Sequence, residues 1–183
     1  MDRICVYCGS NMGTRPAYRN AATRLGKSLA NREIGLVYGG GSVGLMGVVA
    51  DAVLAAGGDA HGVIPEFLVE NEIAHDGLTD LTVVESMHER KQRMVDLADG
   101  FVALPGGFGT LDEFMEVLTW NHLGLHDHPC GLLDIENYYA ELAAFFDHQT
   151  AEGFVGDGQR ATVLIEETPD DLLDRFADSE TLR

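Results

Sequence analysis

The chain has 183 residues, 30 of them acidic and 12 basic, and its formal net charge is −18. This length fits one domain, residues 1–183, with a substantial core. The charge argues against a nucleic-acid partner. Because no secretory leader is recognisable and no run approaches membrane-spanning length, we expect a cytoplasmic protein that has no membrane partner.

Arginine carries almost all of the positive charge, since Lys27 and Lys91 are the only lysines. An acidic surface with so little lysine resembles that of proteins from salt-loving organisms, in which dense salt screens the repulsion between carboxylates. An acidic protein from an ordinary habitat is the alternative. We favour the halophilic interpretation.

Short apolar runs of strand length alternate with helical patterns along the chain. The expected strands are residues 4–7, 35–38, 60–64, 81–85, 101–104, 131–134 and 162–166. The expected helices are residues 16–31, a segment ending near 56, residues 86–99, a segment ending near 123, residues 137–152 and a last one from 169. Residues 66–80 are polar and fit a loop or short helix over a site. Strict alternation implies an α/β fold: a doubly wound parallel sheet of about six or seven strands, with helices on both faces and ligands beyond the carboxyl ends of the strands.

The cysteines and histidines do not indicate a metal site. Cys5 and Cys8 form a C-x-x-C, but Cys5 lies inside an apolar strand and no second pair completes a zinc site. We expect both to be buried as small hydrophobic residues. His122, His126 and His128 cluster near the end of a helix without a fixed carboxylate ligand, which favours a mobile polar loop.

The stretch PGGFGTLDE, residues 105–113, joins an apolar strand to a helix. Its glycines leave the backbone bare, so the unpaired N–H groups of the first helical turn can face a ligand at the positive end of the helix dipole. Such a turn is typical of a phosphate site. The alternative is a capping box, in which Glu113 folds back onto the N–H of Thr110. Capping does not require three glycines, so we favour the phosphate site.

A second element of the same site is the helix that precedes this strand. Ser86 and Glu89 have capping-box spacing there and fit a structural role. Arg90 and Lys91 are adjacent cations in the first turns, where the helix dipole disfavours positive charge. An anionic ligand explains them better than solvation does. This helix begins at the same edge of the predicted sheet as the glycine-rich turn.

The segment Gly39-x-Gly41-x-x-Gly44 formally matches a dinucleotide fingerprint. It follows the second strand rather than the first, and no acidic residue clearly ends the next strand to bind a ribose. We therefore interpret it as a second bare-backbone turn that helps to wall one pocket.

Residues 87–91 (MHERK) and 105–113 together resemble the paired signatures of the LOG family, the cytokinin riboside 5′-monophosphate phosphoribohydrolases that were once labelled lysine decarboxylases. Residues 8–10 (CGS) and the turn at 39–47 also fit. The resemblance implies a Rossmann-like homodimer that needs no metal or cofactor. It implies cleavage of the N-glycosidic bond of an adenine-type nucleoside 5′-monophosphate, such as AMP or a cytokinin riboside 5′-monophosphate, to the free base and ribose 5-phosphate.

The same resemblance implies roles for individual residues. Arg90 and Glu113 correspond to the catalytic pair. The nucleotide or phosphate ligands would be Glu72, Arg90, Lys91, Gly106, Gly107, Phe108, Gly109 and Thr110. The pocket wall would include Gly9, Ser10, Gly40, Gly41 and Met87.

The implied chemistry agrees with the residue types. Breaking a ribosyl C–N bond develops positive charge at the anomeric carbon, as in other glycoside cleavages. A carboxylate such as Glu113 can stabilise that charge or activate the attacking water. Arg90 could hold sugar or phosphate oxygens and keep Glu113 ionised. The residues leave open whether Glu113 is a base, a nucleophile or an electrostatic stabiliser, and whether the base is adenine or a prenylated relative.

Two other functions are compatible with the fold. A non-enzymatic carrier of a nucleotide or of the molybdenum cofactor is the first alternative, but the presence of both Arg90 and Glu113 favours an enzyme. Lysine decarboxylation is the second, and it needs a lysine that binds pyridoxal phosphate. Lys27 lies in the first expected helix and Lys91 is better explained by phosphate, so we do not expect this activity.

The helix after the glycine-rich turn also indicates a partner. Its apolar and aromatic residues lie on more than one side: Leu111, Phe114, Met115, Val117, Leu118 and Trp120. A helix with one exposed face rarely needs this pattern. We therefore expect a homodimer, with burial against a neighbouring helix of the same chain as the alternative.

Overall fold

The short apolar runs of the sequence form the strands of one parallel sheet in the computed structural model, which describes residues 1–69 and 73–181. The strands are β1 (Arg3–Tyr7), β2 (Gly35–Tyr38), β3 (Ala60–Pro65), β4 (Asp80–Val84), β5 (Gly100–Ala103), β6 (Cys130–Leu133) and β7 (Val163–Glu166). Within the described residues their order is β4-β3-β2-β1-β5-β6-β7, and all neighbours are parallel. The predicted doubly wound sheet is therefore confirmed.

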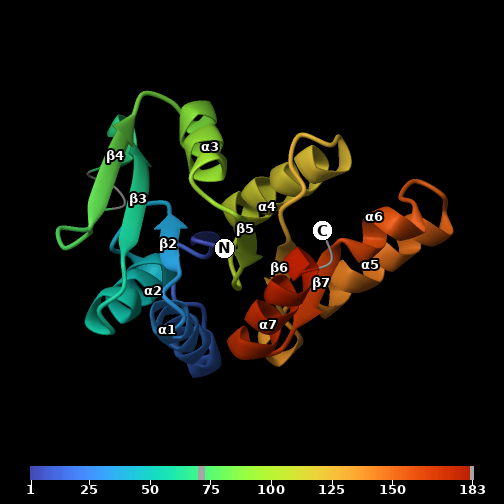
Figure 1. Ribbon diagram of the computed structural model, residues 1–183, viewed down its shortest axis with the longest axis horizontal. Helices are drawn as coiled ribbons and strands as arrows, with labels where there is room; N and C mark the ends of the chain where they lie inside the picture. The colour runs from blue at the N-terminus through green and yellow to red at the C-terminus, as the bar shows by residue number, and fades with distance from the viewer. Residues whose placement is uncertain (70–72, 182–183) are drawn as a thin grey trace.

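Helices cover both faces of this sheet (Figure 1). One face carries α1 (Pro16–Asn31), α2 (Gly44–Ala55) and α7 (Pro169–Thr181). The other carries α3 (Met87–Asp96), α4 (Phe108–His122) and α5 (Ala140–Ala151). Shorter helical segments are η1 (Glu66–Leu68), η2 (Ile135–Asn137) and α6 (Asp157–Ala161). No helix in the described part of the chain combines the length and apolar character that a membrane span requires.

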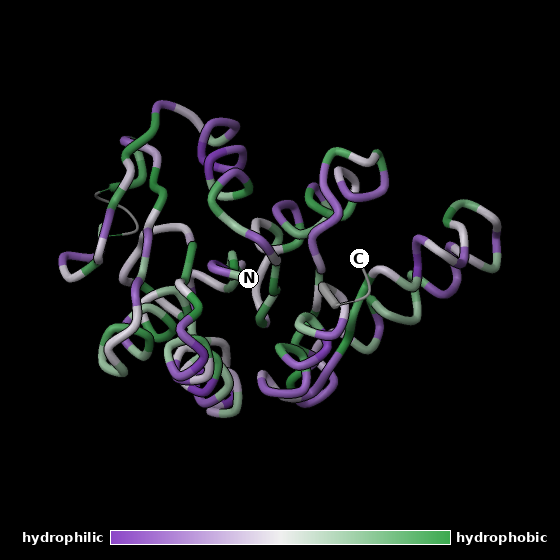
Figure 2. Tube along the Cα trace, in the orientation of Figure 1, coloured by the Kyte–Doolittle hydropathy of each residue, from purple (hydrophilic) through white to green (hydrophobic). Residues whose placement is uncertain are grey.

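Strand β1 shows how the core is divided between the two faces. Successive side chains of a strand point to opposite faces. Ile4 and Val6 accordingly pack beneath α1, α2 and α7, whereas Cys5 and Tyr7 pack beneath α3, α4 and α5. A strand buried on both faces requires a continuous apolar run. Figure 2 shows the complementary pattern along the Cα trace, where hydrophilic residues dominate α3. Cys5 and Cys8 are buried, as predicted.

The helix boundaries differ from the predicted ones in two places. The predicted helix 86–99 ends at Asp96, because Asp99 turns its carboxylate to the N–H groups of Asp2 and Arg3 at the start of β1, at 2.7 and 2.9 Å. The predicted helix 137–152 begins only at Ala140. The two residues before Tyr138 have positive φ values, which a right-handed helix does not allow.

The chain reverses its winding direction beside β1. From β1 it proceeds through β2 and β3 to β4 at one edge, and it then returns to β5 on the other side of β1. In open parallel sheets, ligands bind beyond the carboxyl ends of the strands at such a switch point. The segments that begin there are residues 8–15 after β1, residues 39–43 after β2 and residues 104–107 after β5.

Candidate active site

A cavity of about 270 Å³ lies at the switch point, beyond the carboxyl ends of β1, β2 and β5. It brings together nine of the residues singled out in the sequence: Gly9, Ser10, Met87, Arg90, Gly107, Phe108, Gly109, Thr110 and Glu113. A larger hollow of about 480 Å³ lies between α4, α5 and α6, but none of the predicted site residues lines it. The chemistry therefore concentrates in the smaller cavity.

Arg90 extends from the first turns of α3 and is almost completely buried, with 4% of its surface exposed. Its Nη2 donates to the Gly39 carbonyl at 2.8 Å and its Nε donates to the Val63 carbonyl at 3.1 Å. The Met87 sulfur lies 3.9 Å from Nη1. A guanidinium keeps its proton in proteins, so these carbonyls hold a fixed positive charge at the cavity wall. A Cβ at position 39 would collide with the guanidinium, which explains why this position is a glycine.

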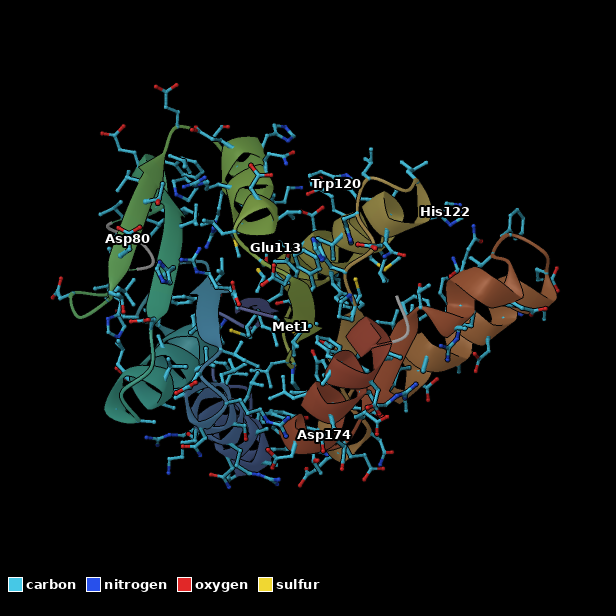
Figure 3. All side chains as sticks on the ribbon, in the orientation of Figure 1. Met1, Asp80, Glu113, Trp120, His122 and Asp174 are labelled. Carbon is cyan, nitrogen blue, oxygen red and sulfur yellow. The ribbon has the colours of Figure 1, made fainter. Side chains whose placement is uncertain are left out.

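Glu113 lies in the second turn of α4 and lines the same cavity. Figure 3 shows it near the centre of the molecule, between α3 and the ends of the central strands. Burial is the main cause that raises the pKa of Cys5; the Glu113 charge raises it further, and the Arg90 charge lowers it. The two opposite charges therefore act on the same buried spot beneath the cavity. Burial, with a contribution from Glu113, also raises the pKa of Tyr7, which keeps this lining phenol protonated.

Helix α4 begins at Phe108, with Gly107 as its N-cap residue and no capping side chain. Thr110 is thus the third helical residue, so the alternative of a Thr110–Glu113 capping box is wrong. The Thr110 hydroxyl is buried against Gly106, where a Cβ would collide with it. Within the described residues, the N–H groups of Phe108, Gly109 and Thr110 have no protein acceptor, and the first helical bond is donated by the next residue to the Gly107 carbonyl.

Lys91 does not line the cavity. Its Nζ lies 3.2 Å from Oδ2 of Asp112 and 3.1 Å from Oε1 of Glu116, and 12% of the side chain is exposed. Burial lowers the pKa of Lys91, but bonds to Glu116 and Asp112 outweigh burial, so the pKa is raised overall. The ammonium is therefore charged, and it joins α3 to α4.

The remaining predicted residues lie around the cavity rather than in it. Gly40 packs against Leu81, and its carbonyl accepts the N–H of His75 at 3.0 Å. Gly41 forms a β-bridge with Ala74. Gly106 lines a neighbouring hollow. The prediction for Glu72 falls outside the described residues.

Several lining residues were not singled out as ligand contacts in the sequence: Val6, Tyr7, Cys8, Gly39, Met46 and Leu68. Tyr7 offered a usable signal, because a polar aromatic residue at the carboxyl end of the first strand lies where ligands bind. Leu68 is part of the segment 66–80 that we expected over the site, and its placement agrees with that expectation.

The histidines near the end of α4 make protein contacts. His126 Nε2 lies 2.9 Å from the Val117 carbonyl, and its Nδ1 accepts the N–H of His128 at 3.2 Å. His122 Nε2 lies 2.6 Å from the Gln159 amide nitrogen. Among the described residues, no group of histidine, cysteine and acidic side chains is arranged to hold a metal ion.

Solved structures with the same fold include two proteins of molybdenum-cofactor biology. The molybdenum cofactor carrier protein from Chlamydomonas reinhardtii is 21% identical, with a TM-score of 0.74 over 97% of this chain and 96% of that one. The molybdenum cofactor binding protein from Rippkaea orientalis is 22% identical, with a TM-score of 0.73 over the same shares. At this identity the likeness establishes the fold alone.

Sequence relatives are much closer. A probable cytokinin riboside 5′-monophosphate phosphoribohydrolase of Oryza sativa subsp. japonica is 48% identical over 171 residues, 93% of this chain and 77% of the relative. A cytokinin riboside 5′-monophosphate phosphoribohydrolase of Arabidopsis thaliana is 44% identical over 176 residues, 96% of this chain and 83% of the relative. Residues 46–176 also match the family model described as a possible lysine decarboxylase. The chain therefore belongs to the LOG family of phosphoribohydrolases.

Proposed function

We propose that this protein hydrolyses the N-glycosidic bond of an adenine-type nucleoside 5′-monophosphate, either AMP or a cytokinin riboside 5′-monophosphate, to the free base and ribose 5-phosphate. The observation that carries the proposal is the meeting of three features in one cavity: the buried Arg90 guanidinium, the Glu113 carboxylate and the uncapped N-terminus of α4. The relatives named as phosphoribohydrolases support it.

The N-terminus of α4 would bind the phosphate. The N–H groups of Phe108, Gly109 and Thr110 have no protein acceptor within the described residues, and the helix dipole adds partial positive charge behind them. A phosphate held there fixes the position of the ribose, and this orientation supplies part of the reduction of the barrier. Gly107 and Gly109 have no side chain, so the phosphate can approach the backbone of this turn closely.

Glu113 would act at the anomeric carbon. As the C1′–N bond breaks, positive charge develops on the sugar, a water oxygen bonds to C1′, and the departing base takes up a proton. A carboxylate one helical turn from the phosphate site can stabilise this charge or activate the water. The fixed charge of Arg90 on the same cavity wall favours the ionised form of the carboxylate.

The experiment is incubation with a panel of nucleoside 5′-monophosphates and identification of the released bases by chromatography. We expect free adenine or a prenylated adenine, together with ribose 5-phosphate. The matching nucleosides without phosphate are the controls, and they should react far more slowly because phosphate binding orients the sugar. If none of the nucleotides releases a base, the proposed hydrolase activity is excluded. A carrier of a nucleotide or of the molybdenum cofactor would then be favoured, since a carrier retains its ligand unchanged.

The described residues do not fit lysine decarboxylation. That chemistry requires a lysine that binds pyridoxal phosphate as a Schiff base. Lys27 lies exposed on α1, and Lys91 is held between Asp112 and Glu116. No lysine of the described chain lines the cavity.

We also propose that the protein is a homodimer. Part of the apolar pattern on α4 is explained within one chain, since Phe114 and Val117 are buried in the core. Met115 remains 38% exposed and borders the hollow between α4, α5 and α6. Leu118, Val155 and Val163 line the same hollow, and a contiguous apolar surface, unlike a single exposed residue, marks interaction sites. Light scattering at working salt should give the dimer mass, and a monomer mass would contradict this proposal.

A further inference from the structure

Two consecutive tyrosines hold the segment that leads from β5 into α4. The Tyr138 hydroxyl donates to the Gly106 carbonyl at 2.5 Å, and the Tyr139 hydroxyl donates to the Leu104 carbonyl at 2.7 Å. The Tyr138 bond is at the short end of the range for O–H···O bonds, and the Tyr139 bond has an ordinary length. The Pro105 carbonyl between them accepts the N–H of Gly9 at 3.1 Å. Three successive carbonyls are therefore each held by a donor from elsewhere in the chain.

These bonds also set the direction of the N–H groups in the turn. A trans peptide unit is planar, so the carbonyl of one residue points opposite to the N–H of the next. The bond to the Pro105 carbonyl fixes the Gly106 N–H, and the bond from Tyr138 fixes the Gly107 N–H. Neither N–H has a protein acceptor within residues 1–69 and 73–181. Gly107 itself lines the candidate cavity.

An uncommon backbone conformation precedes the two tyrosines. Glu136 and Asn137 have φ values of 52° and 60°, in the left-handed region that residues other than glycine seldom adopt. Such conformations persist where the surrounding structure over-determines them. Here Arg15 donates to the Glu136 carboxylate at 3.0 Å, and the Asp134 carboxylate accepts the N–H of Tyr139 at 2.6 Å. The chain is thus held in the turn that aims both hydroxyls at the segment before α4.

The Tyr138 and Tyr139 hydroxyls differ in whether burial explains their hydrogen bonds. Tyr139 is 2% exposed, and a buried hydroxyl needs a hydrogen-bond partner for the stability of the fold. Tyr138 is 42% exposed, so water could satisfy its hydroxyl. Its short bond to the turn is therefore not a consequence of burial. The Tyr138 ring packs edge-on against Tyr18 at 5.5 Å, in a hollow that shares Gly9 and Gly107 with the candidate cavity.

We propose that Tyr138 is a positioning residue for the nucleotide phosphate. It acts through the peptide between Gly106 and Gly107, whose N–H it aims at the phosphate, and it does not touch the nucleotide. Tyr139 supports the same segment from the core. This inference rests on the proposed function and deepens it, because it assigns how the phosphate subsite keeps its geometry.

The test is Tyr138→Phe, which keeps the ring and its packing and removes the hydroxyl. Binding of AMP and of adenosine is measured by calorimetry, both in a Glu113→Gln background so that AMP is not consumed. We expect AMP binding to weaken about threefold to tenfold, because one backbone donor loses its fixed direction. Adenosine binding should stay unchanged, because adenosine has no phosphate.

Tyr18→Phe is the matched control. Tyr18 belongs to the same aromatic cluster and lines the same hollow, but its hydroxyl makes no hydrogen bond within the described residues. Both ligands should bind this variant as they bind the parent. Unchanged AMP binding in Tyr138→Phe, or an equal loss for AMP and adenosine, would overturn the inference. Because the readout is binding, it remains decisive even if the protein releases no adenine, the result that would count against the proposed function.

Discussion

Two glycine-rich turns follow β2 and β5, on either side of β1, and they use their glycines differently. In the first turn the missing side chains make room for the protein itself. A Cβ on Gly39 would collide with the Arg90 guanidinium, and a Cβ on Gly44 would collide with the backbone of Ser10. In the second turn, a Cβ on Gly107 or Gly109 would have no other atom within 4 Å. The first turn is filled by the chain; the second is open at Gly107 and Gly109, although a Cβ on Gly106 would collide with the Thr110 side chain.

This difference shows that glycine spacing alone does not identify a phosphate site. The turn after β2 has the G-x-G-x-x-G spacing of a dinucleotide fingerprint, yet the structure occupies its space with Arg90 and residues 10–11. The turn after β5 leaves bare backbone at the start of a helix, which is the arrangement that anion binding requires. The two turns still cooperate, since the first seats the cation and the second presents the N–H groups of one cavity.

The largest loss of activity is expected from Glu113→Gln, a change in α4, the helix that follows the open turn. The change removes the negative charge and preserves the shape, so kcat for AMP should fall on the order of a hundredfold or more with AMP binding largely kept. No helix-capping bond is lost, because Gly107 and not a Thr110–Glu113 pair caps α4; any change in melting temperature therefore reports on other contacts of the side chain. Paired melting and hydrolysis measurements check this. A stable variant with near-normal adenine release would refute the catalytic role of Glu113.

Gly39→Ala tests the filled turn. The added methyl group meets the Arg90 guanidinium, whose bonds to the Gly39 and Val63 carbonyls would have to shift. Overpacking of this kind typically costs about 1–3 kcal/mol, and displacement of Arg90 should also lower kcat/KM for AMP. Thermal melting and kinetics should therefore both decline. A variant that keeps its melting temperature would show that the close contact is not as rigid as the structure indicates.

Gly109→Ala tests the open turn, and it should change thermal stability and AMP affinity in opposite directions. Gly109 is the second residue of α4, and a Cβ there meets no protein atom. Alanine is favoured over glycine in helices by up to about 1 kcal/mol, so the melting temperature should rise by about 2–4 °C. AMP binding should weaken about tenfold, because a methyl group enters the path of the phosphate. Equal AMP affinity in Gly109→Ala and the parent would show that the phosphate does not bind at this turn.

Much of the fold could be predicted because it depends on local pattern. The apolar runs that form β1 and β5 and the alternation of strands with helices are properties of neighbouring residues. The start of α4 does not follow from the local pattern, since glycine is an acceptable N-cap and the spacing of Thr110 and Glu113 also fits a capping box. The structure decides in favour of Gly107.

The contacts that define the cavity could not be predicted in the same way, because they join distant segments. Arg90 binds the Gly39 carbonyl 51 positions away, and Lys91 pairs with Asp112 across two helices. The sequence marked both cations as unusual but could not tell which one faces the cavity. Tyr138 carried no signal at all, since its role depends on the positive φ values of the two residues before it.

The smallest expected difference concerns salt. With a formal net charge of −18, repulsion between carboxylates is spread over the whole surface, and the screening length falls from about 30 Å at 0.01 M to about 3 Å at 1 M salt. The melting temperature should therefore rise when KCl is increased over this range. This repulsion does not arise in either turn. The melting temperatures of the parent, Gly39→Ala and Gly109→Ala should therefore rise by nearly the same amount, and their rank order should not change. A melting temperature that stays flat or falls as KCl increases would contradict the halophilic interpretation. A shift confined to Gly39→Ala would instead show that the filled turn, through the buried Arg90 charge, is where salt acts.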